Sequence, residues 1–368
     1  WPLRRYDPSN TAHNPTASPP RERPSPRELA SAPSTAARPA FRPLVGPEHV
    51  VVYGSGVAVY PRGGGTARVA SDATTPLAGV GPDGRLHTVG RASGGADAPS
   101  AVVGYGADDI SETYRHPLDA DEPKGMVLGK REVYVGTVDG GVRAIDPDGG
   151  QRWHVGGVAP ALGGGRLYAA GALDGTVAYA ERSGLDRHTR DGPERVWSAG
   201  PVDGFLHLPA VADGRLVVGT YAERGGVVAG VDAEAGERLW TPRPLGTDVS
   251  TPAVVGDRGY TAVGTGGSAG LVVALDLATG ETVWRDETGW PAFAPVVGGD
   301  TLVVAGTADD ADGADGGSAR VRAYDRAEGD VLGTHAFDAG RPGGLALVED
   351  RVLVTAGTSL YELASRSD

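Results

Sequence analysis

Short apolar runs alternate with glycine-bearing turns along most of this chain. The apolar run Leu271–Leu275 leads into Asp276, a turn follows at 278–281, and a second short run ends at Trp284. Two β-type runs around such a turn are typical of a hairpin. The same order of residues recurs at three other places in the chain, where the aspartate of the turn is Asp146, Asp232 or Asp325. The pattern therefore predicts repeated hairpins, and helical periodicity is absent over long stretches.

The tryptophans give the period of these hairpins. Steps of 44, 43 and 44 residues separate Trp153, Trp197, Trp240 and Trp284. A fixed period of this length indicates a repeat architecture, and four short strands in about 40–45 residues are the content of one propeller blade. We expect each tryptophan on the outer strand of its blade, packed against the next blade, because a four-stranded sheet cannot bury its faces alone.

The predicted fold is all-β, an eight-bladed β-propeller of four-stranded antiparallel blades. Strands of the Gly-Thr type recur near residues 51, 87, 134, 168, 217, 260, 303 and 353. This favours eight blades, and seven is the alternative if the two degenerate first repeats are miscounted. The last repeat, 345–363, supplies only three strands. Because an open ring leaves exposed strand edges, we expect a strand from within 27–41 to complete it.

Residues 1–40 differ in composition from the propeller, which we place at 41–368. Prolines recur among serine, alanine and arginine in this leader, and such a stretch has too little apolar surface to offset its ordering entropy. One interpretation is an extended linker from a membrane or surface anchor. The other is a segment that docks along the propeller, above all in its first fifteen residues.

The repeat resembles the pyrroloquinoline-quinone-like (PQQ-like) propeller repeat. The fullest match runs from Val135 to Asp146 and on to Trp153, with Gly-Thr, Asp-Gly and a further aspartate in order. The resemblance covers about 41–363, implies the propeller fold with a ring closed by an N-terminal strand, and extends to propeller lipoproteins that assist outer-membrane protein assembly. The leader, which opens Trp1-Pro2, is similar to leaders of such proteins from salt-loving archaea. One fold hosts many functions, so the resemblance specifies activity weakly.

The family name implies a quinone-dependent dehydrogenase as one function. Those enzymes are much longer, carry a vicinal cysteine pair over the cofactor, and hold Ca²⁺ with Glu, Asn and Asp. This chain has no cysteine, and its two asparagines, Asn10 and Asn14, both lie in the leader. We therefore expect no PQQ cofactor. The sequence also lacks a nucleophile elbow, a zinc-protease motif and a phosphate loop, and its eight histidines are scattered.

Charge and composition limit the classes of partner that the chain is expected to bind. The formal net charge of −13 disfavours nucleic acid and anionic membranes as ligands, and it fits solubility in high salt. No apolar run approaches the length of about 18 residues that a membrane-spanning helix needs. We expect an extracellular or cell-surface location, with a signal peptide or lipid anchor upstream of residue 1, while the cytoplasm stays an alternative.

The connectors between blades carry the candidate binding residues, because such loops meet on one face of a propeller. Trp290 breaks the tryptophan period, so we expect it to face a ligand or partner; the alternative is that it plugs the channel or covers the next blade. Aromatic residues in a polar rim suit a protein interface. The predicted partner-binding set is Phe205, His207, Asp248, Trp290, Phe293 and Arg341, with Arg341 placed to pair with Asp248 or with a partner carboxylate.

An acidic loop at 309–318 is the one candidate metal site. Asp310, Asp312 and Asp315 could hold Ca²⁺, but the loop lacks the spacing of an EF-hand, and a solvated acidic excursion is the favoured interpretation. Our hypothesis is a non-catalytic scaffold or binding module that contacts a protein partner. The alternatives are a PQQ-type oxidoreductase and a structural subunit of a surface or filament complex.

Overall fold

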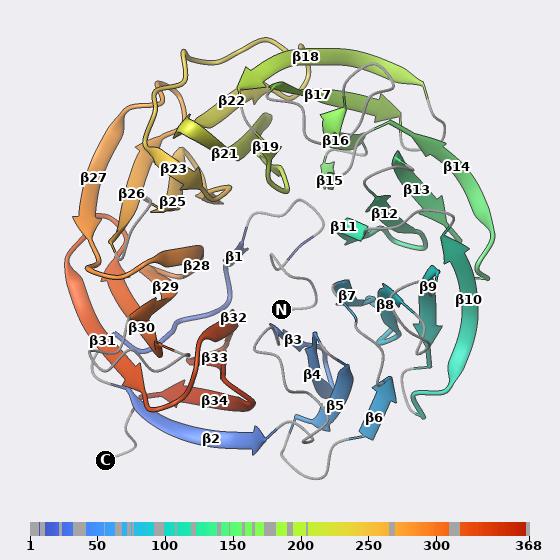
Figure 1. Ribbon diagram of the computed structural model, residues 1–368, viewed down its shortest axis with the longest axis horizontal. Coiled ribbons are helices and arrows are strands. Elements are labelled where there is room, and N and C mark those ends of the chain that lie inside the picture. The colour runs from blue at the N-terminus through green and yellow to red at the C-terminus, as the bar shows by residue number, and fades with distance from the viewer. Residues whose placement is uncertain are drawn as a thin grey trace.

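The protein forms a ring of small sheets around a central channel, as Figure 1 shows. The computed structural model describes residues 7, 12–21, 24–31, 42–54, 56–62, 68–71, 75, 77–91, 99–106, 109–118, 123–137, 141–146, 148–156, 159–163, 166–172, 182–189, 194–203, 205–264, 269–308 and 317–365. Within these ranges every regular element is a strand, and nearly all pairings are antiparallel. The all-β propeller prediction is confirmed.

The first four sheets each contain four consecutive strands. Blade 1 contains β3 (Arg42–Val45), β4 (His49–Tyr53), β5 (Val57–Pro61) and β6 (Arg68–Ser71). Blade 2 contains β7 (Leu77–Val80), β8 (Leu86–Arg91), β9 (Ser100–Tyr105) and β10 (Glu112–Leu118). Blade 3 contains β11 (Pro123–Leu128), β12 (Val133–Thr137), β13 (Gly141–Ile145) and β14 (Gln151–Val155). Blade 4 contains β15 (Ala159–Gly163), β16 (Arg166–Ala172), β17 (Arg182–Thr189) and β18 (Arg195–Asp203).

The next strands form one nine-stranded sheet, which we divide into two blades. Blade 5 contains β20 (Ala210–Ala212), β21 (Arg215–Gly226) and β22 (Val228–Asp232), and blade 6 contains β24 (Ala253–Val255), β25 (Arg258–Gly264), β26 (Gly270–Asp276) and β27 (Thr282–Glu287). The connector strands β19 (Phe205–Leu206) and β23 (Gly246–Val249) bond to β21, and β23 also bonds to β25. The division gives eight groups, and this count is our interpretation of the pairing.

The ring ends where the leader joins it. Blade 7 contains β28 (Ala292–Gly298), β29 (Thr301–Ala308), β30 (Ser318–Asp325) and β31 (Val331–Phe337), and blade 8 contains β32 (Pro342–Val348), β33 (Arg351–Ala356) and β34 (Ser359–Ala364). The leader strand β2 (Ser25–Ser31) pairs antiparallel with β34 and is the outermost strand of blade 8. Its bounds differ from the predicted window, because β2 begins two residues before 27 and ends at 31.

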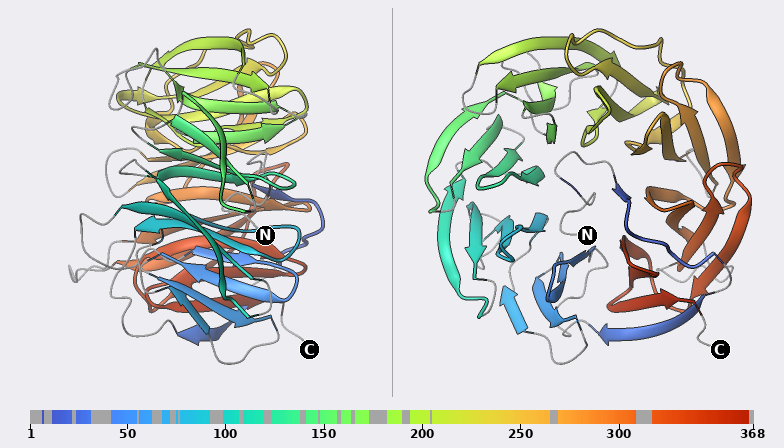
Figure 2. Two further views of the ribbon diagram at one scale, coloured as in Figure 1. Left: turned by 90° about the vertical axis from the view of Figure 1, so that its right-hand side faces the viewer. Right: turned by 180° about the vertical axis from the view of Figure 1, so that it is seen from behind.

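The described part of the leader crosses one face of the ring. The strand β1 (His13–Asn14) pairs in parallel with the inner edge of β28, and Figure 2 shows β1 near the channel and β2 at the rim. The Asn14 side chain donates to the carbonyl oxygen of Leu347 at 2.9 Å. Farther out, the Arg21 guanidinium pairs with Asp325 at 2.5 Å and is the main cause that lowers the pKa of this carboxyl. The described part of the leader thus makes contacts both near the channel and at the rim.

One row of paired residues closes the regular interfaces between blades. In blade 6 the residues Ala253, Tyr260, Ala274 and Trp284 stand opposite one another, one from each strand. We call this set, and its equivalents in the other blades, the wedge row. Its second and fourth residues are the largest, and the rings of Tyr260 and Trp284 lie 6.1 Å apart. Blades 3 and 4 carry the same two ring types, Tyr134 with Trp153 and Tyr168 with Trp197.

The wedge-row tryptophans of blades 4, 5 and 6 each lie against a glycine turn of the next blade. A Cβ atom on Gly329 would lie 2.7 Å from Trp284, and one on Gly280 would lie 2.3 Å from Trp240. Both glycines have positive φ angles, 81° and 73°, which the turn requires. The turn is held by its aspartate: Asp276 accepts from the backbone N–H groups of Ala278 and Thr279. The repeated Asp, Gly and Trp are therefore parts of one inter-blade contact.

Candidate functional site

The candidate site lies on the face of the ring that carries the blade-to-blade connectors. Consecutive antiparallel strands alternate in direction, so the turns between the first and second and between the third and fourth strands of a blade lie on one face. The turn between the second and third strands lies on the opposite face, together with the connector to the next blade. His207, Asp248 and Arg341 all belong to such connectors. We call this the connector face; Figure 2 shows the ring edge-on.

Two connectors are themselves strands on this face. The strand β21 is twelve residues long and continues past blade 5, where β19 and β23 pair with it. The chain can turn tightly between β21 and β22 because Gly225 has a φ angle of 124° and a Cβ atom on Gly226 would lie 2.3 Å from the Thr220 carbonyl oxygen. The result is a ribbon of β19, β21 and β23 that joins blades 5 and 6.

This ribbon brings three polar or aromatic side chains together. His207 Nε2 lies 2.9 Å from Asp248 Oδ1, and these side chains are 39% and 57% exposed. Asp248 stands directly opposite Tyr221 in the β21–β23 pairing, so their side chains project from the same side of the ribbon. Tyr221 is 38% exposed. Because a solvent-exposed pair contributes at most about 1 kcal/mol to folding, the fold itself requires little of His207 and Asp248.

Tyr221 was not among the residues that the sequence indicated. Among the described residues, three other large apolar side chains are exposed, Val196, Val283 and Val331, and each lies on the outermost strand of a blade. Tyr221 instead lies on the connector face. The usable signal was its place directly after Gly219-Thr220, where the second strand of the repeat ends and side chains become accessible.

Trp290 differs from the expectation of an exposed anchor. Its side chain is 5% exposed and belongs to a core cluster that extends over blades 6, 7, 8 and 1. It fits there because the neighbouring strand has a glycine: a Cβ atom on Gly306 would lie 2.2 Å from the indole ring. The guanidinium of Arg322 covers the ring at 5.4 Å from its centroid. Phe293, on β28, is also packed partly into this core. Neither ring is placed to be the main contact of a partner.

The other predicted residues have mixed outcomes. The backbone of Phe205 pairs with Tyr221, and its side chain lies outside what the structure describes. Arg341 is exposed, and Asp248 is paired with His207 in place of the proposed pairing with Arg341. The Ca²⁺ candidates Asp310, Asp312 and Asp315 lie outside the described residues. The connector face thus keeps His207, Asp248 and Arg341, and gains Tyr221.

Neither a metal-ligand cluster nor a membrane-spanning helix is found among the described residues. Within them no group of three or more His, Asp or Glu side chains is placed to hold a metal ion. Helices long and apolar enough to cross a membrane are likewise not found there. Asn14, an amide that a quinone-bound Ca²⁺ could use, accepts from Thr16 N and Oγ1 and donates to Leu347.

Comparison with known proteins supports a PQQ-like β-propeller. A protein-family pattern described as "Outer membrane protein assembly factor BamB" matches residues 138–288. A curated relative of the same description from Burkholderia pseudomallei (strain K96243) is 33% identical over 168 residues. The aligned part is 43% of this chain and 40% of that protein. The chain thus spans well under half the length of the curated relative that it matches.

Solved structures agree on the fold over nearly the whole chain. A computationally designed protein, Ika8, has a TM-score of 0.70 at 14% identity and covers 92% of this chain and 100% of its own. BamB from Moraxella catarrhalis has a TM-score of 0.66 at 18% identity, with 93% and 98% covered. A europium-containing methanol dehydrogenase has a TM-score of 0.67 at 12% identity, with 98% and 90% covered. Identities this low show the fold alone.

Proposed function

We propose that this PQQ-like β-propeller is a non-catalytic binding module that contacts a protein partner through its connector face, outside the cytoplasm. The observation that carries the proposal is the β19–β21–β23 ribbon, which presents Tyr221 beside the His207–Asp248 pair. An exposed aromatic ring with a polar rim is the composition of a binding hot spot.

Two further facts support a partner at this place. The ribbon departs from the regular blade, because β21 is longer than a blade strand needs to be and bonds to two connectors. The family description that matches 138–288 names a protein assembly factor, which is a protein-binding role. A surface built beyond the needs of the ring, in a chain with that likeness, is best explained by recognition.

The test compares partner capture by surface variants. We expect Tyr221→Ala combined with Asp248→Ala to lose most of the protein captured from native extract, because truncation of a central ring and its polar neighbour removes hot-spot contacts. The matched control is Val283→Ala, an exposed residue on the outer strand β27, which should capture the same proteins as the unmodified chain. Retention of every partner by a well-folded double variant would rule out this face.

Absorption spectroscopy distinguishes the binding module from the alternative function, a PQQ-type oxidoreductase. A quinone cofactor absorbs in the near ultraviolet and visible range, so purified protein mixed with PQQ and Ca²⁺ would show a shifted cofactor spectrum if it bound. We expect the spectrum of the mixture to equal the sum of its parts. The third interpretation, a subunit of a larger assembly, predicts a mass in solution that depends on residues 1–40.

A further inference from the structure

An open cavity of about 290 Å³ lies between blades 1 and 2, on the face opposite the connector face. Its walls come from the β3–β4 turn, the β7–β8 turn and the β9–β10 turn. Val51, Val59, Val80, Leu86 and Ile110 give it an apolar interior, and Glu48, His49 and Asp83 lie at its rim. None of these residues belongs to the proposed connector-face site.

The cavity lies at the place where other blades insert their aromatic wedge. In blade 1 the wedge row is Leu44, Val51, Val59 and Arg68. Val51 therefore stands where blades 3, 4 and 6 have a tyrosine, and Arg68 stands where they have a tryptophan. The two rings that close those interfaces are missing here, and apolar walls remain around the space.

The turn that receives the wedge is altered as well. Gly106 N donates to Ser111 O, which matches Asp276 N donating to Glu281 O in blade 6. By this alignment Ile110 stands at the position of Gly280. Ile110 keeps the left-handed backbone of that glycine, with a φ angle of 57°. A β-branched residue in this region is a strained outlier, and such strain is concentrated at functional sites.

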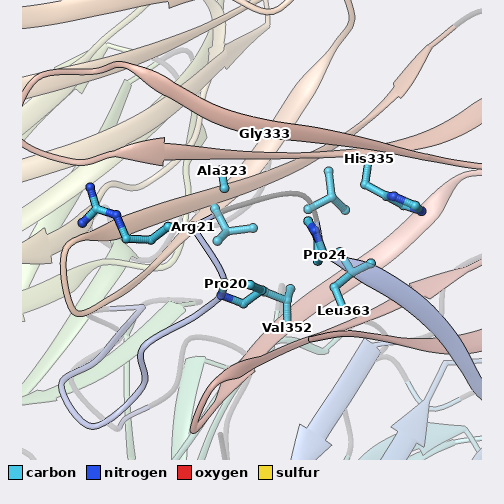
Figure 3. A pocket seen from close by; sticks show the side chains of 10 residues that line it. Pro20, Arg21, Pro24, Ala323, Gly333, His335, Val352 and Leu363 are labelled. Atoms are coloured by element: carbon cyan, nitrogen blue, oxygen red, sulfur yellow. The ribbon is translucent and has the colours of Figure 1, made fainter. Parts of the chain in front are cut away.

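A second interface without the rings shows what can fill such a space. In blade 7 the wedge row is Val296, Val303, Ala323 and Gly333. There the chain's own leader covers the row: Pro20, Arg21 and Pro24 line the remaining gap, which is only about 20 Å³ (Figure 3). An extended polypeptide segment thus substitutes for the wedge between blades 7 and 8, whereas the space between blades 1 and 2 stays open.

We propose that the cavity between blades 1 and 2 is a binding socket for an aromatic side chain, above all an indole, presented by a segment of a partner polypeptide. The aromatic wedges of blades 3, 4 and 6 show that rings are a shape which fits between neighbouring blades. The Glu48 carboxylate at the rim can accept from an indole N–H or attract basic flanking residues; the Asp83 charge is shared with Arg85 at 3.4 Å. The partner segment is therefore aromatic and basic.

The test is titration calorimetry on the full chain with short capped peptides. The probe is acetyl-Lys-Trp-Lys-amide, and the comparison peptides are acetyl-Lys-Leu-Lys-amide, acetyl-Glu-Trp-Glu-amide and the proline-rich acetyl-Ser-Pro-Pro-Arg-amide. We expect the Lys-Trp-Lys peptide to bind most tightly, with a dissociation constant on the order of a millimolar or below, as befits one buried ring. Tighter binding of the leucine, acidic or proline-rich peptide, or no binding, would overturn the proposal.

Two variants locate the site. Val51→Tyr restores the ring of the repeat inside the socket and should weaken binding at least about tenfold, because the phenol takes the ligand's space. Ile110→Gly removes the strained side chain from the receiving turn and should strengthen binding. Val283→Ala on the outer rim is the control, and melting curves show that each variant folds. Binding that neither Val51→Tyr nor Ile110→Gly changes would place the peptide elsewhere and contradict the socket. Free indole that binds where the peptide does not would show a small-molecule pocket in its place.

Discussion

The interface between blades 6 and 7 and the interface between blades 1 and 2 are built on the same row of residues but are filled differently. Blade 6 inserts Tyr260 and Trp284, and Trp284 stacks on Tyr324 of blade 7 with ring centroids 5.8 Å apart. Blade 1 has Val51 and Arg68 at the same places and leaves a cavity of about 290 Å³. Regular interfaces are thus closed from within, while the degenerate ones leave space for another chain segment.

The largest effect is expected at the interface between blades 8 and 1, where the leader supplies the outer strand. Arg27 of β2 occupies the tryptophan position of the wedge row and pairs with the buried Glu362 at 3.1 Å. Deletion of residues 25–31 would expose the edge of β34 and leave Glu362 with Arg351 alone. We expect a loss of several kcal/mol, a large share of the roughly 5–15 kcal/mol that stabilises a domain. Chemical denaturation measures it, with deletion of residues 1–11 as the control; equal midpoints for the two deletions would contradict closure by β2.

The next effect concerns the ring that closes a regular interface. Trp284→Ala removes the wedge over Gly329 and the bond from Trp284 Nε1 to Arg326 O, so we expect a cost of roughly 3–5 kcal/mol. The control is Val283→Ala, which changes the exposed neighbour of Trp284. This substitution should lower the free energy of unfolding by less than about 0.5 kcal/mol. Because Trp290 is the more deeply buried ring, Trp290→Ala should cost at least as much as Trp284→Ala. If the Trp284→Ala and Val283→Ala chains had the same melting temperature, the wedge would not be what closes the interface.

The interface between blades 2 and 3 replaces the Tyr–Trp pair with His87 and Tyr114, and this makes stability depend on pH. His87 Nδ1 lies 3.0 Å from the Tyr114 hydroxyl, and burial lowers the pKa of His87 from 6.5 to about 4. Between these values the unfolded chain binds more protons than the folded one. The free energy of unfolding therefore has its full value above pH 6.5, where His87 is neutral in both states. It decreases as the pH falls toward 4, by roughly 3 kcal/mol at most.

The measurement is the unfolding free energy from pH 7 to pH 4.5 for the unmodified chain and for His87→Tyr, which restores the tyrosine of the repeat. We expect the difference between the two chains to grow as the pH falls through this window. A difference that stays constant with pH would mean that His87 does not titrate on unfolding.

The smallest effect is global. With a net charge of −13, self-repulsion should weaken the fold in dilute buffer, and salt should screen it. We expect the melting temperature to rise by a few degrees between dilute and molar sodium chloride, in the unmodified chain and in Val51→Tyr alike. A melting temperature that is indifferent to salt would remove the case for adaptation to high salt.

The sequence predicted the regular interfaces well and the exceptional ones poorly. The period of the tryptophans specified the blade repeat because the same wedge position carries a tryptophan in each of blades 3 to 6. It could not show that Pro20 and Pro24 cover the row at Gly333, because this contact joins segments more than 300 residues apart. Nor could the sequence place Trp290, whose burial depends on the absent side chain of Gly306 on a neighbouring strand.

The most direct test of the account restores the wedge where the leader now replaces it. In a chain that lacks residues 1–24 and keeps β2, Val303→Tyr with Gly333→Trp should recover most of the stability that the deletion removes. In the full chain the same double change should destabilise, because the rings compete with Pro20 and Pro24 for the space. Unfolding free energies of the four chains decide this. Opposite signs for the two backgrounds are the predicted result, and a loss of stability in both would contradict the claim that the leader stands in for the aromatic wedge.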